Sequence, residues 1–117
     1  MTNRALMDKS MSEEDFAGAV VDLALSCGWK VKREPPWRPA CRKHDSAVGF
    51  PDLVLVRDGR LIFAELKAEK AKKPSEAQLE WIDALEHHDT RGIMQEHHYG
   101  VFVWRPSDWD EIEEVLR

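Results

Sequence analysis

Two apolar runs, residues 52–57 and 60–66, are separated only by Asp58-Gly59, and this arrangement limits the possible folds more than any other feature of the chain. An Asp-Gly pair between two such runs predicts a β-hairpin closed by a two-residue turn. Counting back from that turn places Asp52 directly opposite Glu65, with both side chains on the same face. The hairpin therefore predicts two carboxylates side by side at its open end.

The strands that carry these carboxylates are apolar on both faces, which is typical of central strands in a covered sheet. Two carboxylates facing each other there repel and lose hydration, so we expect a cation between them. A hard divalent ion such as Mg²⁺ suits these oxygen ligands, with the backbone carbonyl of Leu66 as a further ligand. Lys67 points to the same face and is placed to hold a water or to stabilise charge on a phosphorane. The structural alternative is that Lys67 forms a salt bridge with both carboxylates.

The rest of the chain supplies helices and further strands around the hairpin. Helical spacing predicts a helix between Ser12 and Gly28, a second opened by Pro74-Ser75, and a last one opened by Pro106-Ser107. We expect Leu79, Ile82 and Leu85 of the second helix to face inward. With strands over 29–33 and 99–104, the order α-β-β-β-α-β-α predicts an α/β fold with a central mixed β-sheet flanked by helices. The 117 residues fit a single domain over 12–117 after a loose tail over 1–11.

The charges are spread unevenly along the chain. A formal net charge of −5 argues against a nucleic-acid partner, but basic side chains gather in residues 30–43 and 67–73. An acidic protein with two basic segments can still hold a phosphate backbone, whereas the alternative is that these side chains solvate a surface. The candidate nucleic-acid-binding residues are Lys32, Arg33, Arg38, Arg42, Lys43, Lys70, Lys72 and Lys73.

The sequence around the two carboxylates resembles a known nuclease signature. Gly49-Phe50-Pro51-Asp52, followed by Glu65-Leu66-Lys67, resembles the motif of the PD-(D/E)XK nucleases. Together with residues 53–56, 63–64 and 103–108, these segments are similar to the VRR-NUC branch, and the similarity spans about residues 12 to 116. The resemblance implies a restriction-endonuclease-like core and cleavage of DNA phosphodiesters with Mg²⁺, or Mn²⁺ as a substitute. Asp52 and Glu65 would bind the metal, and Lys67 would serve catalysis.

The resemblance implies two further site residues. A carboxylate on the first helix often completes such a site, and Glu13 lies on the inward stripe of that helix, about 100° from Glu14. We therefore prefer Glu13 as a catalytic and metal-binding residue, while the alternative is that both are N-terminal charges favoured by the helix dipole. Gln78 matches a polar position on the helix after the lysine, where it would orient Lys67 or contact a phosphate. The segment 86–98 is longer than this connection usually is.

The expected function is a metal-dependent endonuclease, and analogy with small members of the family implies selectivity for branched or junction DNA. A homodimer is expected, as are a helicase or recombination partner and a phage origin. No apolar run reaches the ~20 residues of a membrane helix, and the N-terminus lacks a secretory signal, so we expect a cytoplasmic protein without a membrane partner. One alternative is a non-catalytic nucleic-acid-binding module of the same fold. Another is an interaction protein whose carboxylates are structural.

Overall fold

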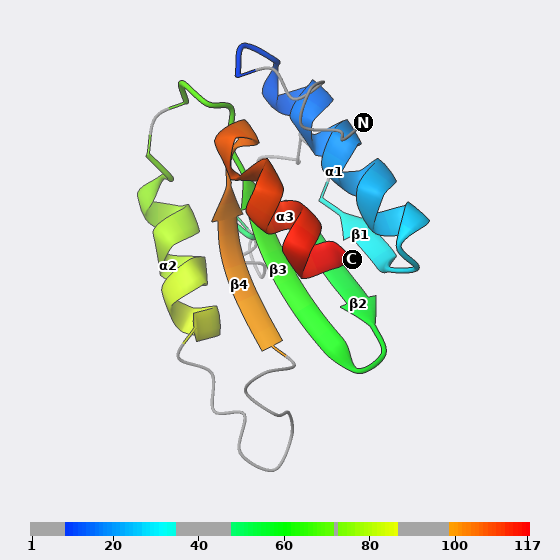
Figure 1. Cartoon of the computed structure of the whole chain (residues 1–117). Coiled ribbons are helices and arrows are strands. Elements are labelled where there is room, and N and C mark those ends of the chain that lie inside the picture. Colours follow the sequence, from blue (N-terminus) through cyan, green and yellow to red (C-terminus); the bar gives the residue numbers. More distant parts are fainter. Residues whose placement is uncertain (1–8, 35–47, 72, 87–98) are drawn as a thin grey trace.

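The computed structural model describes residues 9–34, 48–71, 73–86 and 99–117, and Figure 1 shows how their helices and strands are arranged. In chain order the elements are α1 (Glu13–Ser26), β1 (Lys30–Arg33), β2 (Leu53–Arg57), β3 (Arg60–Leu66), α2 (Glu76–Glu86), β4 (Tyr99–Trp104), the 3-10 helix η3 (Pro106–Asp108) and α3 (Trp109–Leu116). The predicted α/β class with a mixed sheet is confirmed. Within these described ranges, no helix has the length and apolar character needed to cross a membrane.

β2 and β3 form the predicted hairpin in the predicted register. Arg57 pairs with Arg60 across the ladder. The turn residues Asp58 and Gly59 have φ angles of 51° and 80°, the left-handed values that a two-residue type I′ turn requires. Counting along this register brings Asp52, the residue before β2, into line with Glu65 of β3.

The sheet has the order β1-β2-β3-β4. β1 and β3 both run antiparallel to β2, whereas β4 runs parallel to β3. A parallel pair needs a crossover connection, and α2 lies in the connection between β3 and β4. β2 and β3 are therefore both paired along their two edges, and the functional side chains of the hairpin lie at the end of these two central strands.

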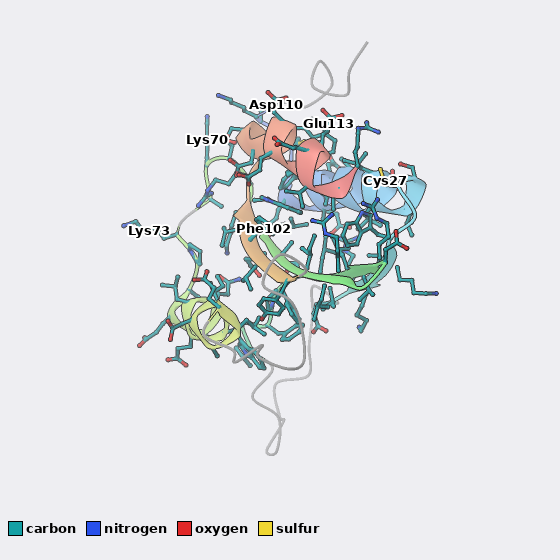
Figure 2. The ribbon with its side chains drawn as sticks, turned by 60° about the horizontal axis from the view of Figure 1, so that its bottom comes forward. Cys27, Lys70, Lys73, Phe102, Asp110 and Glu113 are labelled. Carbon is teal, nitrogen blue, oxygen red and sulfur yellow. The ribbon has the colours of Figure 1, made fainter. Side chains whose placement is uncertain are left out.

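The main core lies between one face of the sheet and the helices α1 and α3. Figure 2 shows α1 and α3 together on one side of the sheet, with α2 on the other side. Leu53 and Leu55 of β2 and Ile62 and Ala64 of β3 point into the core, where each is at most 2% exposed. Burial of this apolar surface is the main favourable contribution to folding.

α1 begins and ends where the sequence predicts. The hydroxyl of Ser12 accepts a hydrogen bond from the backbone N–H of Asp15 (3.0 Å), and Gly28 follows the helix with a φ angle of 89°. Residues 1–8 of the predicted tail lie outside the described residues. Met11, at the end of that tail, packs against the core, so the tail is not loose up to its last residue.

α2 turns Ile82 and Leu85 inward as predicted, but not Leu79. Leu79 is 51% exposed, whereas Gln78, Trp81, Ile82 and Leu85 are partly buried. These four positions follow the helical spacing i, i+3, i+4 and i+7. The prediction for Leu79 was wrong because it selected apolar residues alone, and the inward stripe of α2 starts with a polar side chain.

An aromatic cluster joins α2 to its side of the sheet. The ring of Phe50 packs edge-to-face against Phe63 of β3 and Trp81 of α2, with ring centroids 5.9 Å and 5.0 Å apart. The centroids of Tyr99 and Phe63 are 6.0 Å apart. Such contacts bury large apolar areas in a specific geometry. Val56 is nevertheless 40% exposed, so the described elements cover this face less completely than the sequence led us to expect.

Candidate active site

Asp52 lies immediately before β2 and reaches across to β3. Its Oδ2 atom accepts a hydrogen bond from the backbone N–H of Leu66 (2.8 Å). If the register of the hairpin is continued, Pro51 lies opposite Leu66. Because proline has no N–H, Pro51 cannot donate a backbone hydrogen bond to the carbonyl of Leu66. Since the N–H and C=O of a strand residue point to the same side, that carbonyl is directed toward Asp52.

Glu65 is the one charged side chain that is fully buried in the described part of the chain, at 2% exposure. Burial, followed by the charge of Asp52, raises the pKa of Glu65 to about 8. Burial also raises the pKa of Asp52, although the N–H of Leu66 acts in the opposite direction. Oε1 of Glu65 is buried and accepts no well-formed hydrogen bond from the described residues, although the backbone N–H of Asp52 is near enough to the carboxyl group to lower its pKa. A buried oxygen without a partner is rare and needs an explanation, such as an ion that occupies the site.

Lys67 contributes a positively charged side chain to the site. Its Nζ atom lies 3.8 Å from Oε2 of Glu65, and its side chain is 15% exposed. Its backbone N–H donates to the carbonyl of Trp104 in β4 (2.9 Å), which fixes the start of the segment that follows β3. The structure therefore brings Asp52, Glu65 and Lys67 together at the open end of the hairpin. The ion pair with Glu65 is also what the structural alternative predicts.

Gln78 reaches the site from α2. Its side-chain Nε2 donates a short hydrogen bond to Oε2 of Glu65. Its Oε1 accepts from the backbone N–H of Ser75 (2.7 Å). Gln78 was expected to orient Lys67 or to contact a phosphate, but its contact in this structure is with Glu65.

The first helix presents its two neighbouring glutamates to different partners. Oε1 of Glu13 lies 3.4 Å from the backbone N–H of Ala68, and the charge of Glu13 raises the pKa of both Asp52 and Glu65. Glu14 instead forms an ion pair with Arg33 (2.8 Å). This arrangement favours Glu13 over Glu14 as the carboxylate that faces the site.

The donor atoms of the site fit a hard divalent cation in part. Carboxylate oxygens of Asp52 and Glu65 and the carbonyl of Leu66 are the oxygen ligands that Mg²⁺ prefers, and Oε1 of Glu65 has no competing partner in the described structure. Within the described residues, however, no three Asp, Glu, His or Cys side chains come close enough together to hold an ion. In this conformation Glu13 therefore does not join the pair as a third carboxylate. Mg²⁺ commonly binds through one or two carboxylates and keeps several waters, so the pair is sufficient.

The predicted nucleic-acid-binding residues divide into three groups. Lys32 and Arg33 of β1 are engaged by acidic neighbours, with Lys32 3.7 Å from Glu34 and Arg33 paired with Glu14. Lys70 and Lys73 are exposed on the segment that joins β3 to α2, and Figure 2 shows both side chains extending outward at the same edge of the molecule. The other four, Arg38, Arg42, Lys43 and Lys72, lie outside the described residues.

Two residues near the site have roles that the sequence analysis missed. Ser75 was treated as a helix start, although its spacing to Gln78 is the signature of a capping box. Gly49 was treated only as part of a motif. It has a φ angle of 87°, and a Cβ atom built on it would lie 2.5 Å from the carbonyl carbon of Ala77. No local sequence signal predicts that contact, since it joins two segments through the tertiary structure.

Comparison of the chain with protein-family models, with curated proteins and with solved structures found no match. The interpretation of the site therefore rests on the geometry and chemistry of its own residues.

Proposed function

We propose that this protein is a metal-dependent nuclease of restriction-endonuclease-like fold that hydrolyses DNA phosphodiester bonds. The observation that carries the proposal is the pairing of buried Glu65 with half-buried Asp52 beside Lys67, in which one glutamate oxygen has no well-formed hydrogen bond from the described residues. Buried, repelling carboxylates are unfavourable for folding. A cation bound between the two carboxylates would offset their repulsion.

Asp52, Glu65 and the carbonyl of Leu66 would hold a Mg²⁺ or Mn²⁺ ion. When bound there, the ion would polarise a phosphoryl oxygen and lower the pKa of water. The hydrogen bond from the N–H of Leu66 (2.8 Å) keeps Asp52 directed at β3, and Gln78 holds Oε2 of Glu65. Glu13 would act from α1 through its charge or through a water.

Lys67 would act on the reacting groups themselves. Its Nζ atom is tethered 3.8 Å from Glu65 and can donate a hydrogen bond to the attacking water or to the phosphoryl oxygen that gains negative charge. Removing one such donor typically lowers kcat by about 10²–10³-fold.

The surroundings of the site support DNA as the substrate. Lys70 and Lys73 are exposed on the segment that leads away from Lys67, where they can contact phosphates. An open cavity of about 260 Å³ lies along α2, the helix that carries Gln78, and is lined by Val48, Ala77, Glu80, Trp81 and Ala84. A cavity with an aromatic wall can receive an unpaired base by stacking, which supports selectivity for branched or single-stranded regions. Action as a homodimer, in the cytoplasm and beside a helicase or recombination protein, is part of the same proposal.

A non-catalytic binding module is the second candidate. The observation that favours it is that the described residues do not bring three carboxylates together around an ion. Such a module would bind DNA through the same lysines without cutting it.

The test is cleavage of labelled duplex, single-stranded, flapped and four-way-junction DNA with Mg²⁺, Mn²⁺ or EDTA. We expect cutting that requires the metal, and we expect Lys67→Ala to reduce its rate about 10²–10³-fold. Lys70→Ala is the matched control, since it removes an exposed lysine of the same segment and should weaken DNA binding without abolishing the chemical step. If the native chain binds DNA but cuts none of the four substrates, the binding module replaces the nuclease.

A further inference from the structure

The start of α2 makes two kinds of contact at once. The hydroxyl of Ser75 accepts from the backbone N–H of Gln78 (3.2 Å), and the backbone N–H of Ser75 donates to Oε1 of Gln78 (2.7 Å). This reciprocal pair is a capping box, which satisfies N–H groups that a helix leaves without partners at its first turn. The same glutamine also donates its Nε2 to Glu65. One side chain therefore caps a helix and contacts a buried carboxylate.

The capping box determines which end of the amide meets Glu65. A backbone N–H can only donate, so the atom of Gln78 that it meets must be the oxygen. The NH₂ group is then directed at Glu65, where it can only donate. This donation occupies Oε2 of Glu65, whereas Oε1 has no partner in the described structure. The orientation of the amide is thus fixed by Ser75, and it distinguishes the two oxygens of Glu65.

Gly49 sets the distance between this helix start and the hairpin. It packs so closely on the backbone of α2 that a Cβ atom would lie 2.5 Å from the carbonyl carbon of Ala77 and 2.7 Å from the nitrogen of Gln78. Asp52 follows three residues later in the same segment. The contact therefore ties the backbone of Gln78 to the segment that carries Asp52, and it holds Gln78 within reach of Glu65.

We infer that Ser75 and Gly49 are positioning residues which, acting through Gln78, hold Glu65 with one oxygen hydrogen-bonded and the other available to a divalent cation. The inference rests on the proposed function in its statement about the cation. Its geometric part concerns the metal-free protein and can be tested separately.

The experiment compares native protein with Ser75→Ala and Ser75→Thr. In the metal-free protein, NMR of the Gln78 side-chain NH₂ group reports whether its hydrogen bond to Glu65 persists. Ser75→Ala keeps the backbone N–H that donates to Oε1 of Gln78 but removes the hydroxyl that holds this N–H against the first turn of α2. We expect the resonance to be shifted and protected from exchange in the native chain and in Ser75→Thr, which keeps the hydroxyl, and to lose part of both properties in Ser75→Ala. Mn²⁺ titration then reports the cation site, and we expect about tenfold weaker binding in Ser75→Ala, with native affinity in Ser75→Thr.

A loss of helix capping alone would lower stability and disturb the first turn of α2, which carries Gln78, but it would leave the Mn²⁺ affinity of the folded fraction unchanged. An unchanged Gln78 resonance in Ser75→Ala would overturn the inference. A changed resonance with unchanged Mn²⁺ affinity would overturn it as well. If native protein binds no Mn²⁺, the proposed metal site is wrong, and so is the part of the inference that concerns the cation. The Gln78 resonances still decide whether Ser75 orients Gln78.

Discussion

Glu65 combines a buried position with a charge that its surroundings oppose. Its pKa of about 8 in the folded chain lies above the value of 4.5 for an unperturbed glutamate. Between these values the folded state keeps a proton that the unfolded state has lost, so stability falls as the pH rises. The contribution of the protonated Glu65 to the free energy of unfolding is complete below pH 4.5 and is lost as the pH passes about 8. A divalent ion in the site would replace that proton and reverse the loss.

Replacing Glu65 by Gln removes the titration and keeps the shape of the side chain. We expect the metal-free Glu65→Gln variant to be more stable than the native chain above about pH 8 and to approach it below pH 4.5. Urea unfolding over a pH series measures the difference. Equal pH dependence in the two chains would show that Glu65 does not carry the buried proton.

At the scale of elements, the site depends on how closely α2 approaches the hairpin. Gly49 lies directly against the backbone of α2, and its φ angle of 87° already excludes most other residues. Gly59 in the hairpin turn offers a comparison, because its φ angle of 80° is similar but a Cβ atom there would meet nothing within 4 Å. The two glycines therefore separate backbone strain from close packing.

We expect Gly59→Ala to lower the free energy of unfolding by the strain alone, about 1–3 kcal/mol. Gly49→Ala should cost more than Gly59→Ala by about 1–3 kcal/mol, since the added methyl group overlaps the backbone of Ala77. Chemical denaturation of both variants gives the comparison. Equal losses would mean that α2 moves away from Gly49 without cost.

At the scale of the whole molecule, the end of the chain is held far from the candidate site. Arg57, beside the hairpin turn, donates hydrogen bonds to the carbonyls of Cys27 (2.8 Å) and Leu116 (2.9 Å). The indole N–H of Trp29 also donates a hydrogen bond to the carbonyl of Leu116 (2.8 Å). The guanidinium of Arg57 lies over the ring of Trp29. These contacts join α1, the hairpin and α3 at the end of the hairpin opposite to Asp52.

Arg57→Met should therefore lower stability without changing the site. We expect a loss of about 2–4 kcal/mol, because two charge-assisted hydrogen bonds to backbone carbonyls disappear. Arg60→Met is the matched control. Its hydrogen bond to the carbonyl of Val115 is longer (3.4 Å) and its guanidinium lies farther from the centroid of the Trp29 ring (5.3 Å), so we expect a smaller loss. Unfolding curves and Mn²⁺ titration of folded protein check both statements. A weakened Mn²⁺ site in Arg57→Met would show that the two ends of the hairpin are coupled.

The sequence by itself determined the parts of this protein that depend on local rules. Asp58-Gly59 specifies a two-residue turn, and strand periodicity then places Asp52 and Glu65 on one face whatever surrounds them. The spacing of apolar residues was sufficient for the α/β class, and in α3 the same helical spacing separates the buried residues Trp109, Ile112 and Leu116. These features follow from residues that are neighbours along the chain.

Only the tertiary structure decided how the site is completed. Residues far apart in sequence must meet before Gln78 can select one oxygen of Glu65 and before Gly49 can contact Ala77. The exposure of Leu79 has the same origin, because a helix packs by the face that its neighbours accept. Periodicity ranks residues by their own hydrophobicity, whereas a polar side chain turns inward when a buried partner offers it a hydrogen bond.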